Sequence, residues 1–280
     1  YTSVASNLGE LFNKGFEVSV NSVNVQQKNG FGWNSSLVFS FNRNEIKHLY
    51  GEMIDLLDGE GNVIGQKEAD DWTNGWFIGE AIDRIWDYKF LGIWQENEAE
   101  QAAVFGQYPG DPKLQDTNGD EALTNEDKIF QELKKPQYRL GVGNNFRILK
   151  NIEVSAFIRA DLGHFGANGL YKKGNQEERL NDYDVPYWTA ENPSNEYTRI
   201  AHVTPAPYNY YEPKGFLRVQ DLSISYIFPA NLIQSTPIKN LSVYLSGRNL
   251  FTITKWSNWD PESGAIPLPK FYTIGLNLTL

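Results

Sequence analysis

The segment DTNGDEALTNED, residues 116–127, has the side chains and the spacing of a calcium-binding loop. Asp116, Asn118, Asp120 and Asp127 occupy the first, third, fifth and twelfth positions of a loop that surrounds a hard cation with oxygen ligands. The seventh position, which supplies a backbone carbonyl, is Ala122. The spacing therefore predicts a Ca²⁺ or Mg²⁺ site formed by these five residues.

The sixth position of this loop departs from the template. Glu121 stands where the sharp turn requires glycine. A structural ion that stiffens the loop therefore fits better than a calcium sensor, and we expect no other cofactor. The alternative is an acidic surface loop in which Asn118 and Gly119 only form a turn.

Aromatic residues are a second group with chemical potential, since they make up 14% of the chain. Flat rings with polar edges suit the faces of sugars and the binding surfaces of partner proteins. The alternatives are a belt at a membrane interface and packing within loops. The candidate contact residues are Trp72, Trp76, Tyr187, Trp188, Tyr210, Trp256 and Trp259.

Signatures of covalent catalysis are missing from the sequence. Gly141 and Gly143 lack the third glycine of a dinucleotide-binding fingerprint, and there is no GxSxG or HExxH motif. We therefore expect that the protein is not an enzyme.

The net charge of −10, without clustered basic residues, argues against a nucleic-acid partner. The absence of cysteine removes disulfides, thiol catalysis and cysteine-based zinc sites. No apolar run approaches the ~20 residues of a membrane-spanning helix.

Strands dominate the predicted secondary structure. From Phe271 to Leu280, apolar residues alternate with small or polar ones, which is the pattern of a strand with one apolar face. The same pattern recurs in six further segments: 14–27, 31–44, 137–149, 151–162, 215–228 and 240–254. Several of these segments exceed the usual ~5–6 residues of soluble strands and match the roughly ten residues that cross a bilayer.

The connections between these strands alternate in length. The first, third and fifth are short, whereas the second, fourth and sixth cover about 45–136, 163–214 and 255–269. In an up-and-down antiparallel sheet this places every long loop at one end, as in outer-membrane barrels with long extracellular loops. The competing fold is a soluble β-sandwich, in which half-buried strands also alternate.

Seven strands do not close an even-numbered membrane barrel, and open edges in lipid are costly. The chain also begins at Tyr1 without Met or a signal peptide. We therefore expect a piece of a larger protein, whose remaining strands complete the barrel.

Several segments resemble one family when they are taken in order. They are Asn13 to Val20, the loop from Asp116 to Asp120, GFLRVQDLSISY (215–226), GRNLFTITK (247–255) with WDPE (259–262), and TIGLNLT (273–279). Together they are similar to the C-terminal part of SusC/RagA-type TonB-dependent outer-membrane transporters. The final residue departs from the family, because Leu280 stands where such barrels commonly end in an aromatic residue.

The resemblance implies an all-β transmembrane barrel of 22 strands, of which residues 1–280 form the last seven. It also implies a plug domain and a TonB-contacting motif, neither of which lies in this chain, and a SusD-like surface lipoprotein that acts as a lid. The expected function is active import of oligosaccharides, or alternatively of peptides, across the outer membrane of a Gram-negative, Bacteroidota-like bacterium. The alternative from another class is a secreted carbohydrate-binding β-sandwich with a calcium-stiffened loop.

Overall fold

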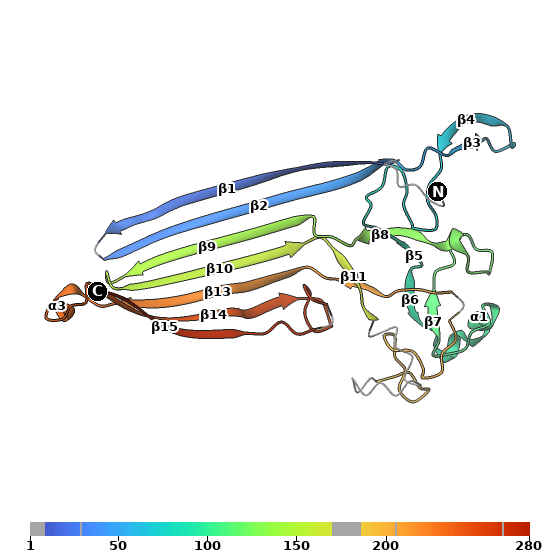
Figure 1. The fold of residues 1–280 in the computed structure, drawn as a ribbon. Coiled ribbons are helices and arrows are strands. Elements are labelled where there is room, and N and C mark those ends of the chain that lie inside the picture. Colours follow the sequence, from blue (N-terminus) through green and yellow to red (C-terminus); the bar gives the residue numbers. More distant parts are fainter. Residues whose placement is uncertain (1–8, 29, 170–185, 205, 265) are drawn as a thin grey trace, which may run out of the picture.

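A computed structural model describes residues 9–28, 30–169, 186–204, 206–264 and 266–280. Parts of the predicted loops 163–214 and 255–269 therefore lie outside the described residues. One large antiparallel sheet dominates the structure, and its seven strands follow one another in sequence order (Figure 1). They are β1 (Glu10–Lys28), β2 (Phe31–His48), β9 (Tyr138–Ile148), β10 (Ile152–Leu162), β13 (Phe216–Ile227), β14 (Asn240–Thr254) and β15 (Phe271–Thr279).

This order confirms the predicted up-and-down sheet of seven long strands. The first two strands are longer than the sequence pattern indicated, because β1 begins at Glu10 and β2 continues to His48. The turn between β9 and β10 is tight, since Leu149 and Lys150 both have positive φ, at 51° and 67°. A short helix, α3 (Ala230–Ile233), lies in the link between β13 and β14.

The apolar residues of the strands lie in register on one face of the sheet. Val18 pairs with Phe39, Leu140 with Ala160, and Ile224 with Leu245. Many of these side chains are exposed, up to 78% for Ile274. Among the described residues no second large sheet covers this face, so the β-sandwich alternative is wrong. An uncovered apolar face is the expected outer surface of a strand-built membrane protein.

A β-bulge interrupts the alternation in β13. Asp221 pairs with Phe157, but Val219 pairs with Ile158, so Gln220 is the extra residue. A bulge shifts the side-chain period by one residue. The apolar side chains therefore stand at even positions from Leu222 onwards and at odd positions up to Val219. For this reason the alternation within the predicted segment 215–228 is clear only in its second half, although β13 extends over nearly the whole segment.

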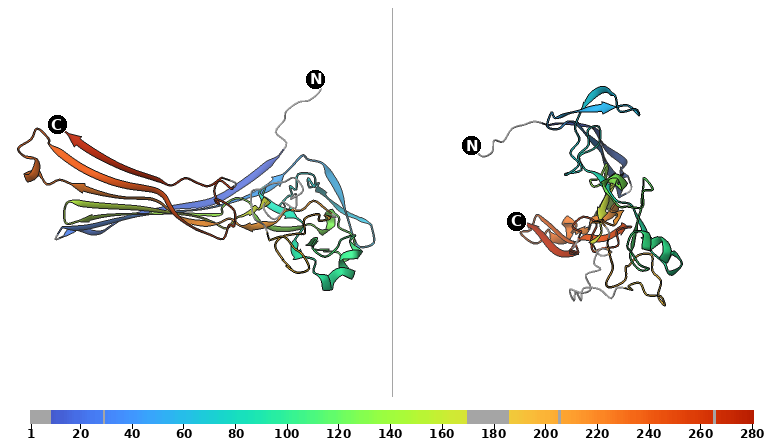
Figure 2. Two further views of the ribbon diagram at one scale, coloured as in Figure 1. Left: turned by 90° about the horizontal axis from the view of Figure 1, so that it is seen from below. Right: turned by 90° about the vertical axis from the view of Figure 1, so that its right-hand side faces the viewer.

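The three long links gather at one end of the sheet, and the short turns lie at the other (Figures 1 and 2). The first long link (49–137) joins β2 to β9, the second (163–215) joins β10 to β13, and the third (255–270) joins β14 to β15. The first two contain small elements of their own: β3 (Met53–Leu57), β4 (Val63–Glu68), β5 (Arg84–Asp87), β6 (Phe90–Ile93), α1 (Ala99–Val104), β7 (Pro112–Leu114), β8 (Ile129–Leu133), β11 (Phe165–Ala167) and β12 (Tyr211–Pro213). Short 3₁₀ turns at Glu96–Glu98 and Asn125–Asp127 complete the first link.

The buried core lies in these links rather than in the sheet. Tyr88 and Leu114 from the first link pack with Ala206 and Tyr208 from the second. Among the residues that the structure describes, no helix is long and apolar enough to cross a membrane.

Candidate functional site: the surface formed by the long links

Buried carboxylates join the first long link to the second. Asp111 is fully buried, and its carboxylate accepts hydrogen bonds from Arg199 Nε at 2.7 Å and from the backbone amide of Val203 at 2.9 Å. Because a buried carboxylate needs a positive or donating partner, Asp111 holds the second link against the first.

Asp87 makes a second connection of the same kind. Its Oδ2 accepts hydrogen bonds from Asn209 Nδ2 at 2.8 Å and from the Tyr211 hydroxyl at 2.9 Å. Burial, together with the negative charge of Asp87, raises the pKa of Tyr211, so this phenol stays protonated and continues to donate. Polar contacts at two buried aspartates therefore join the two links.

Glu212 joins the second link to the third. Both oxygens of this buried carboxylate accept from the Ser257 hydroxyl, at 3.0 and 2.8 Å, and Asn168 Nδ2 donates to Oε2 at 2.9 Å. All three long links are thus connected by contacts between their described residues at this end of the sheet.

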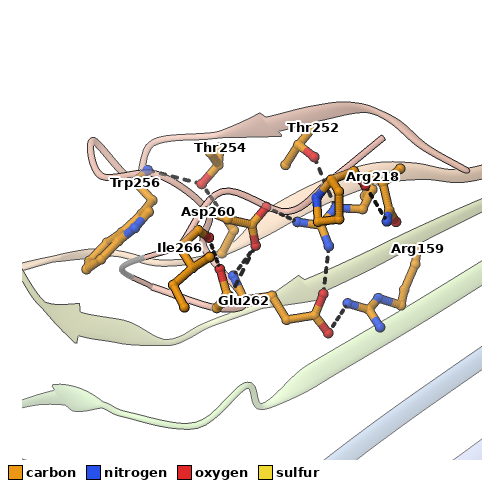
Figure 3. Close-up of polar contacts among 12 residues, drawn as sticks. Arg159, Arg218, Thr252, Thr254, Trp256, Asp260, Glu262 and Ile266 are labelled. Atoms are coloured by element: carbon orange, nitrogen blue, oxygen red, sulfur yellow. Dashed lines mark hydrogen bonds and ion pairs between the residues drawn. The ribbon is translucent and has the colours of Figure 1, made fainter. Parts of the chain in front are cut away.

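The Arg218 cluster, which consists of Arg159, Arg218, Asp260 and Glu262, attaches the third link to the strands (Figure 3). The Arg218 side chain is only 1% exposed, and its Nη2 lies 2.6 Å from Asp260 Oδ2 while its Nη1 lies 2.6 Å from Glu262 Oε2. Arg159 Nη2 lies 2.7 Å from the other oxygen of Glu262. Burial alone would raise the pKa of Glu262, but the two arginines outweigh it and the pKa is lowered.

Sequence reasoning did not find this cluster. The segments LRVQD and WDPE contain Arg218 and the acidic residues of the cluster. Alternation does not show, however, which charged residues meet when they are about forty positions apart in the sequence. The available signal was the spacing of Phe216 and Arg218. These residues are two positions apart in a strand, so their side chains share one face, and that face is buried at Phe216.

The predicted metal ligands Asp116, Asp120 and Asp127 come together in the structure. Each offers an oxygen within 4.8 Å of the others. Gly119 N donates to Asp116 Oδ1 at 2.7 Å, and Ala122 N donates to Asp120 Oδ1 at 2.9 Å, which wraps the backbone around the carboxylates. The arrangement suits a hard cation, which takes carboxylate and carbonyl oxygens.

Asn118 and Asp127 fit this arrangement, whereas Glu121 is strained. Asn118 lies beside the carboxylates, and its Nδ2 donates to Asp120 Oδ2 at 3.1 Å. Glu121 has a φ of 62°, the left-handed conformation that glycine adopts without strain. Burial alone would raise the pKa of Asp127, but the amides of Thr124 and Thr117 outweigh it and lower the pKa, so this residue stays ionised.

The predicted aromatic contacts fall into two groups. Trp188 and Trp256 are 8% and 6% exposed and pack inside the links, where the Trp188 indole nitrogen donates to Gln95 at 3.1 Å. Tyr210 and Trp76 are half-buried, and the Tyr210 ring meets Phe90 edge to face. Burial leaves these four rings little area for an external molecule.

The remaining rings face outwards. Trp72, Tyr187 and Trp259 are 54%, 39% and 58% exposed. Trp72 is held edge-on by Phe77 and Trp86, with centroids 5.1 and 5.3 Å away, so its position is fixed although its face is open. A fixed and exposed ring is the arrangement expected for contact with a ligand or a partner protein.

A hollow of about 800 Å³ lies between the long-link ends of β1 and β2 and the first long link. Its wall carries charged side chains of both signs, among them Glu17, Glu80, Asp83, Arg84, Lys135 and Arg139.

Comparison with known proteins supports the resemblance seen in the sequence, although no family model matches the chain. TonB-dependent receptor P26 of Formosa agariphila is 29% identical over all of this chain and 30% of its own length. TonB-dependent receptor P3 of the same organism is 28% identical over 99% of this chain and likewise 30% of its own length. The chain thus spans about a third of these relatives.

Solved structures show the same fold. A structure of the RagAB peptide transporter superposes with a TM-score of 0.73 and 20% identity, over 97% of this chain and 30% of the neighbour. The open-open state of the RagAB peptide importer gives a TM-score of 0.68. The seven-stranded sheet therefore has the fold of part of an antiparallel β-barrel, in which the apolar face lies outside and the polar face lies towards the lumen.

Proposed function

Because the chain is similar along its whole length to TonB-dependent receptors, we propose that it forms part of an active importer in the outer membrane. The observation that carries this proposal is the sheet itself. Its apolar face is uncovered while its polar face bears Arg159 and Arg218, and every long link lies at the same end. This combination suits a barrel wall with an outer binding surface.

The substrate we propose is an oligosaccharide. Its support is the set of exposed rings, Trp72, Tyr187 and Trp259, of which Trp72 is held in place by two other rings, since flat rings stack on sugar faces. A peptide is the second candidate, because the solved neighbours are named as a peptide transporter. In both cases the chain binds and passes its substrate without covalent chemistry.

The proposed partners rest on the same similarity. A SusD-like lipoprotein covers the surface of the long links, and TonB acts through regions outside this chain. Remaining barrel strands and a plug complete the protein in the membrane.

Uptake by cells tests this function. In a strain that lacks the full-length gene, uptake of labelled oligosaccharides or peptides should fall to the level of a TonB-deficient strain, and the complete gene should restore it. Loss of oligosaccharide uptake supports the first substrate and loss of peptide uptake the second. Two results together would contradict the proposal: unchanged uptake of both substrates in the deletion strain, and absence of the protein from the outer-membrane fraction of the parent strain.

We also propose that residues 116–127 hold a structural Ca²⁺ or Mg²⁺. The support is the convergence of Asp116, Asp120 and Asp127, together with the amides that keep Asp127 ionised. In the full-length protein, added Ca²⁺ or Mg²⁺ should slow proteolysis of this loop, and Asp120→Asn should remove most of the protection. Equal cleavage rates in Ca²⁺, Mg²⁺ and chelator would sink this idea.

A further inference from the structure

The two arginines of the Arg218 cluster share one aromatic support. The guanidinium carbons of Arg159 and Arg218 lie 5.2 and 4.7 Å from the centre of the Phe216 ring. Stacking on a ring fixes a guanidinium without using its hydrogen-bond donors. The strands therefore hold two positive groups side by side on the lumen face, at the end where the long links lie.

Arg218 keeps its place without Glu262. Asp260 binds its Nη2, and Thr252 Oγ1 accepts from its Nε at 3.0 Å. Asp260 also orders its own turn, since its Oδ1 accepts from the amides of Glu262 and Ser263 at 2.9 and 3.3 Å. Asp260 therefore makes the contacts that attach the third link to Arg218.

Glu262 has a different position. Its side chain is 45% exposed, and its two carboxylate oxygens reach only Arg159 and Arg218 in the part of the chain that the structure describes. Because the Glu262 carboxylate is itself half-exposed, water compensates for part of the loss when it leaves the arginines. Arg159 also has donors to spare, because its buried Nε has no hydrogen-bond partner among the described residues.

From this geometry we propose that Arg159 and Arg218 form a binding site for the carboxylate group of a solute, and that Glu262 occupies the site until such a solute displaces it. Two fixed guanidiniums match a carboxylate, because each oxygen meets a separate donor. Displacement leaves the Asp260 attachment and its turn in place, and it frees the Glu262 side chain from the two arginines. The site binds a carboxylate whichever substrate the barrel imports, and direct binding tests it independently of transport.

Two sources supply this chemistry, a uronic acid and a peptide C-terminus. Glucuronate and N-acetylglycine are the probes for them, and glucose and N-acetylglycinamide are the matched neutral molecules. The chain has no cysteine, so Ile266→Cys places a single environment-sensitive dye on the third link, at a side chain that is 69% exposed. The labelled protein is the purified full-length transporter in detergent, with cysteines outside this chain replaced by serine.

We expect at least one carboxylate probe to change the dye signal and both neutral molecules to leave it unchanged. Response to glucuronate alone assigns a uronic acid, and response to N-acetylglycine alone assigns a peptide terminus. Glu262→Gln removes the tethered competitor, so direct binding measured by calorimetry should tighten by about tenfold.

Arg159→Gln should abolish binding, whereas Arg147→Gln, at an arginine near the short turns, should leave it unchanged. Heat-dependent migration on gels checks that each variant retains a folded barrel. Equal responses to charged and neutral probes, no tightening in Glu262→Gln, or full binding by folded Arg159→Gln would each overturn the proposal.

Discussion

Arg218 Nη2 lies 2.6 Å from Asp260 Oδ2, and this buried ion pair fastens the third long link to β13. The arginine is 1% exposed and the aspartate side chain 9% exposed, so neither charge has water as a substitute partner. The link that follows β14 is therefore anchored to the neighbouring strand β13 as well as to its own.

Removal of one charge from this pair should be costly. We expect Asp260→Asn to lower the free energy of unfolding by roughly 3–5 kcal/mol, because it leaves Arg218 buried without its main counter-charge. Urea unfolding of the full-length protein in detergent measures this loss, and trypsin should cut faster at Lys255 and Lys270. The matched control is Asp55→Asn in the exposed β3–β4 hairpin, with an expected change within about 0.5 kcal/mol. Equal effects of the two substitutions would show that the pair is not structural.

Gly275 leaves room for the ring of Tyr244 on the lumen face. A Cβ at position 275 would lie 2.3 Å from Tyr244 Cζ, so Gly275→Ala must displace the ring. We expect a loss of about 1–3 kcal/mol. Tyr244→Ala removes the obstacle, and the double variant should lose less than the sum of the single losses. Additive losses in urea unfolding would refute this contact.

Glu121 is strained by its positive φ of 62°. Glu121→Gly should raise stability by about 0.5–1 kcal/mol and slow proteolysis of residues 116–127, because glycine adopts this conformation freely. Glu121→Ala removes the same charge but retains a Cβ, and it should give no such gain. A gain of equal size in both variants would assign the effect to charge.

Asp127 makes the 116–127 loop sensitive to acid. Its pKa is lowered in the folded protein, so its contribution to stability is complete above the unfolded pKa of about 3.9 and is lost as pH falls through the folded value. Cleavage of the loop by pepsin should therefore accelerate below about pH 4. Asp127→Asn should raise cleavage already at about pH 5 and flatten the pH dependence. The same steep dependence in the variant would show that other carboxylates control the loop.

Trp72 and Trp256 should respond differently to truncation. Trp72→Ala removes an exposed ring, so binding of oligosaccharide or of the lipoprotein should weaken about tenfold or more while stability changes little. Trp256→Ala empties a buried position and should cost roughly 3–5 kcal/mol. Isothermal titration and urea unfolding separate the two effects. Unchanged binding by Trp72→Ala would remove this ring from the contact surface.

Much of the architecture was readable from the sequence. Period-two alternation located all seven strands, and the contrast between short and long links placed the loops at one end, because both signals depend only on neighbouring residues. The spacing from Asp116 to Asp127 likewise placed three carboxylates together, since a short loop holds its own residues near one another.

The aromatic residues show where local patterns stop being informative. The sequence grouped Trp72 with Trp188 and Trp256, yet only Trp72 is exposed, because burial depends on how separate links pack. The bulge at Gln220 similarly reversed the faces of β13 without any mark in composition.

By itself the sequence determined the strands, their order and the acidic loop, since hydrophobic periodicity and close spacing act over a few residues. Only the tertiary structure decided which charges meet. The fold brings distant segments together and removes water from between them. It thereby forms the ion pairs Arg218–Asp260 and Asp111–Arg199 and the hydrogen bond between Asp87 and Tyr211. A buried charge then requires one particular partner, and that requirement connects the three links.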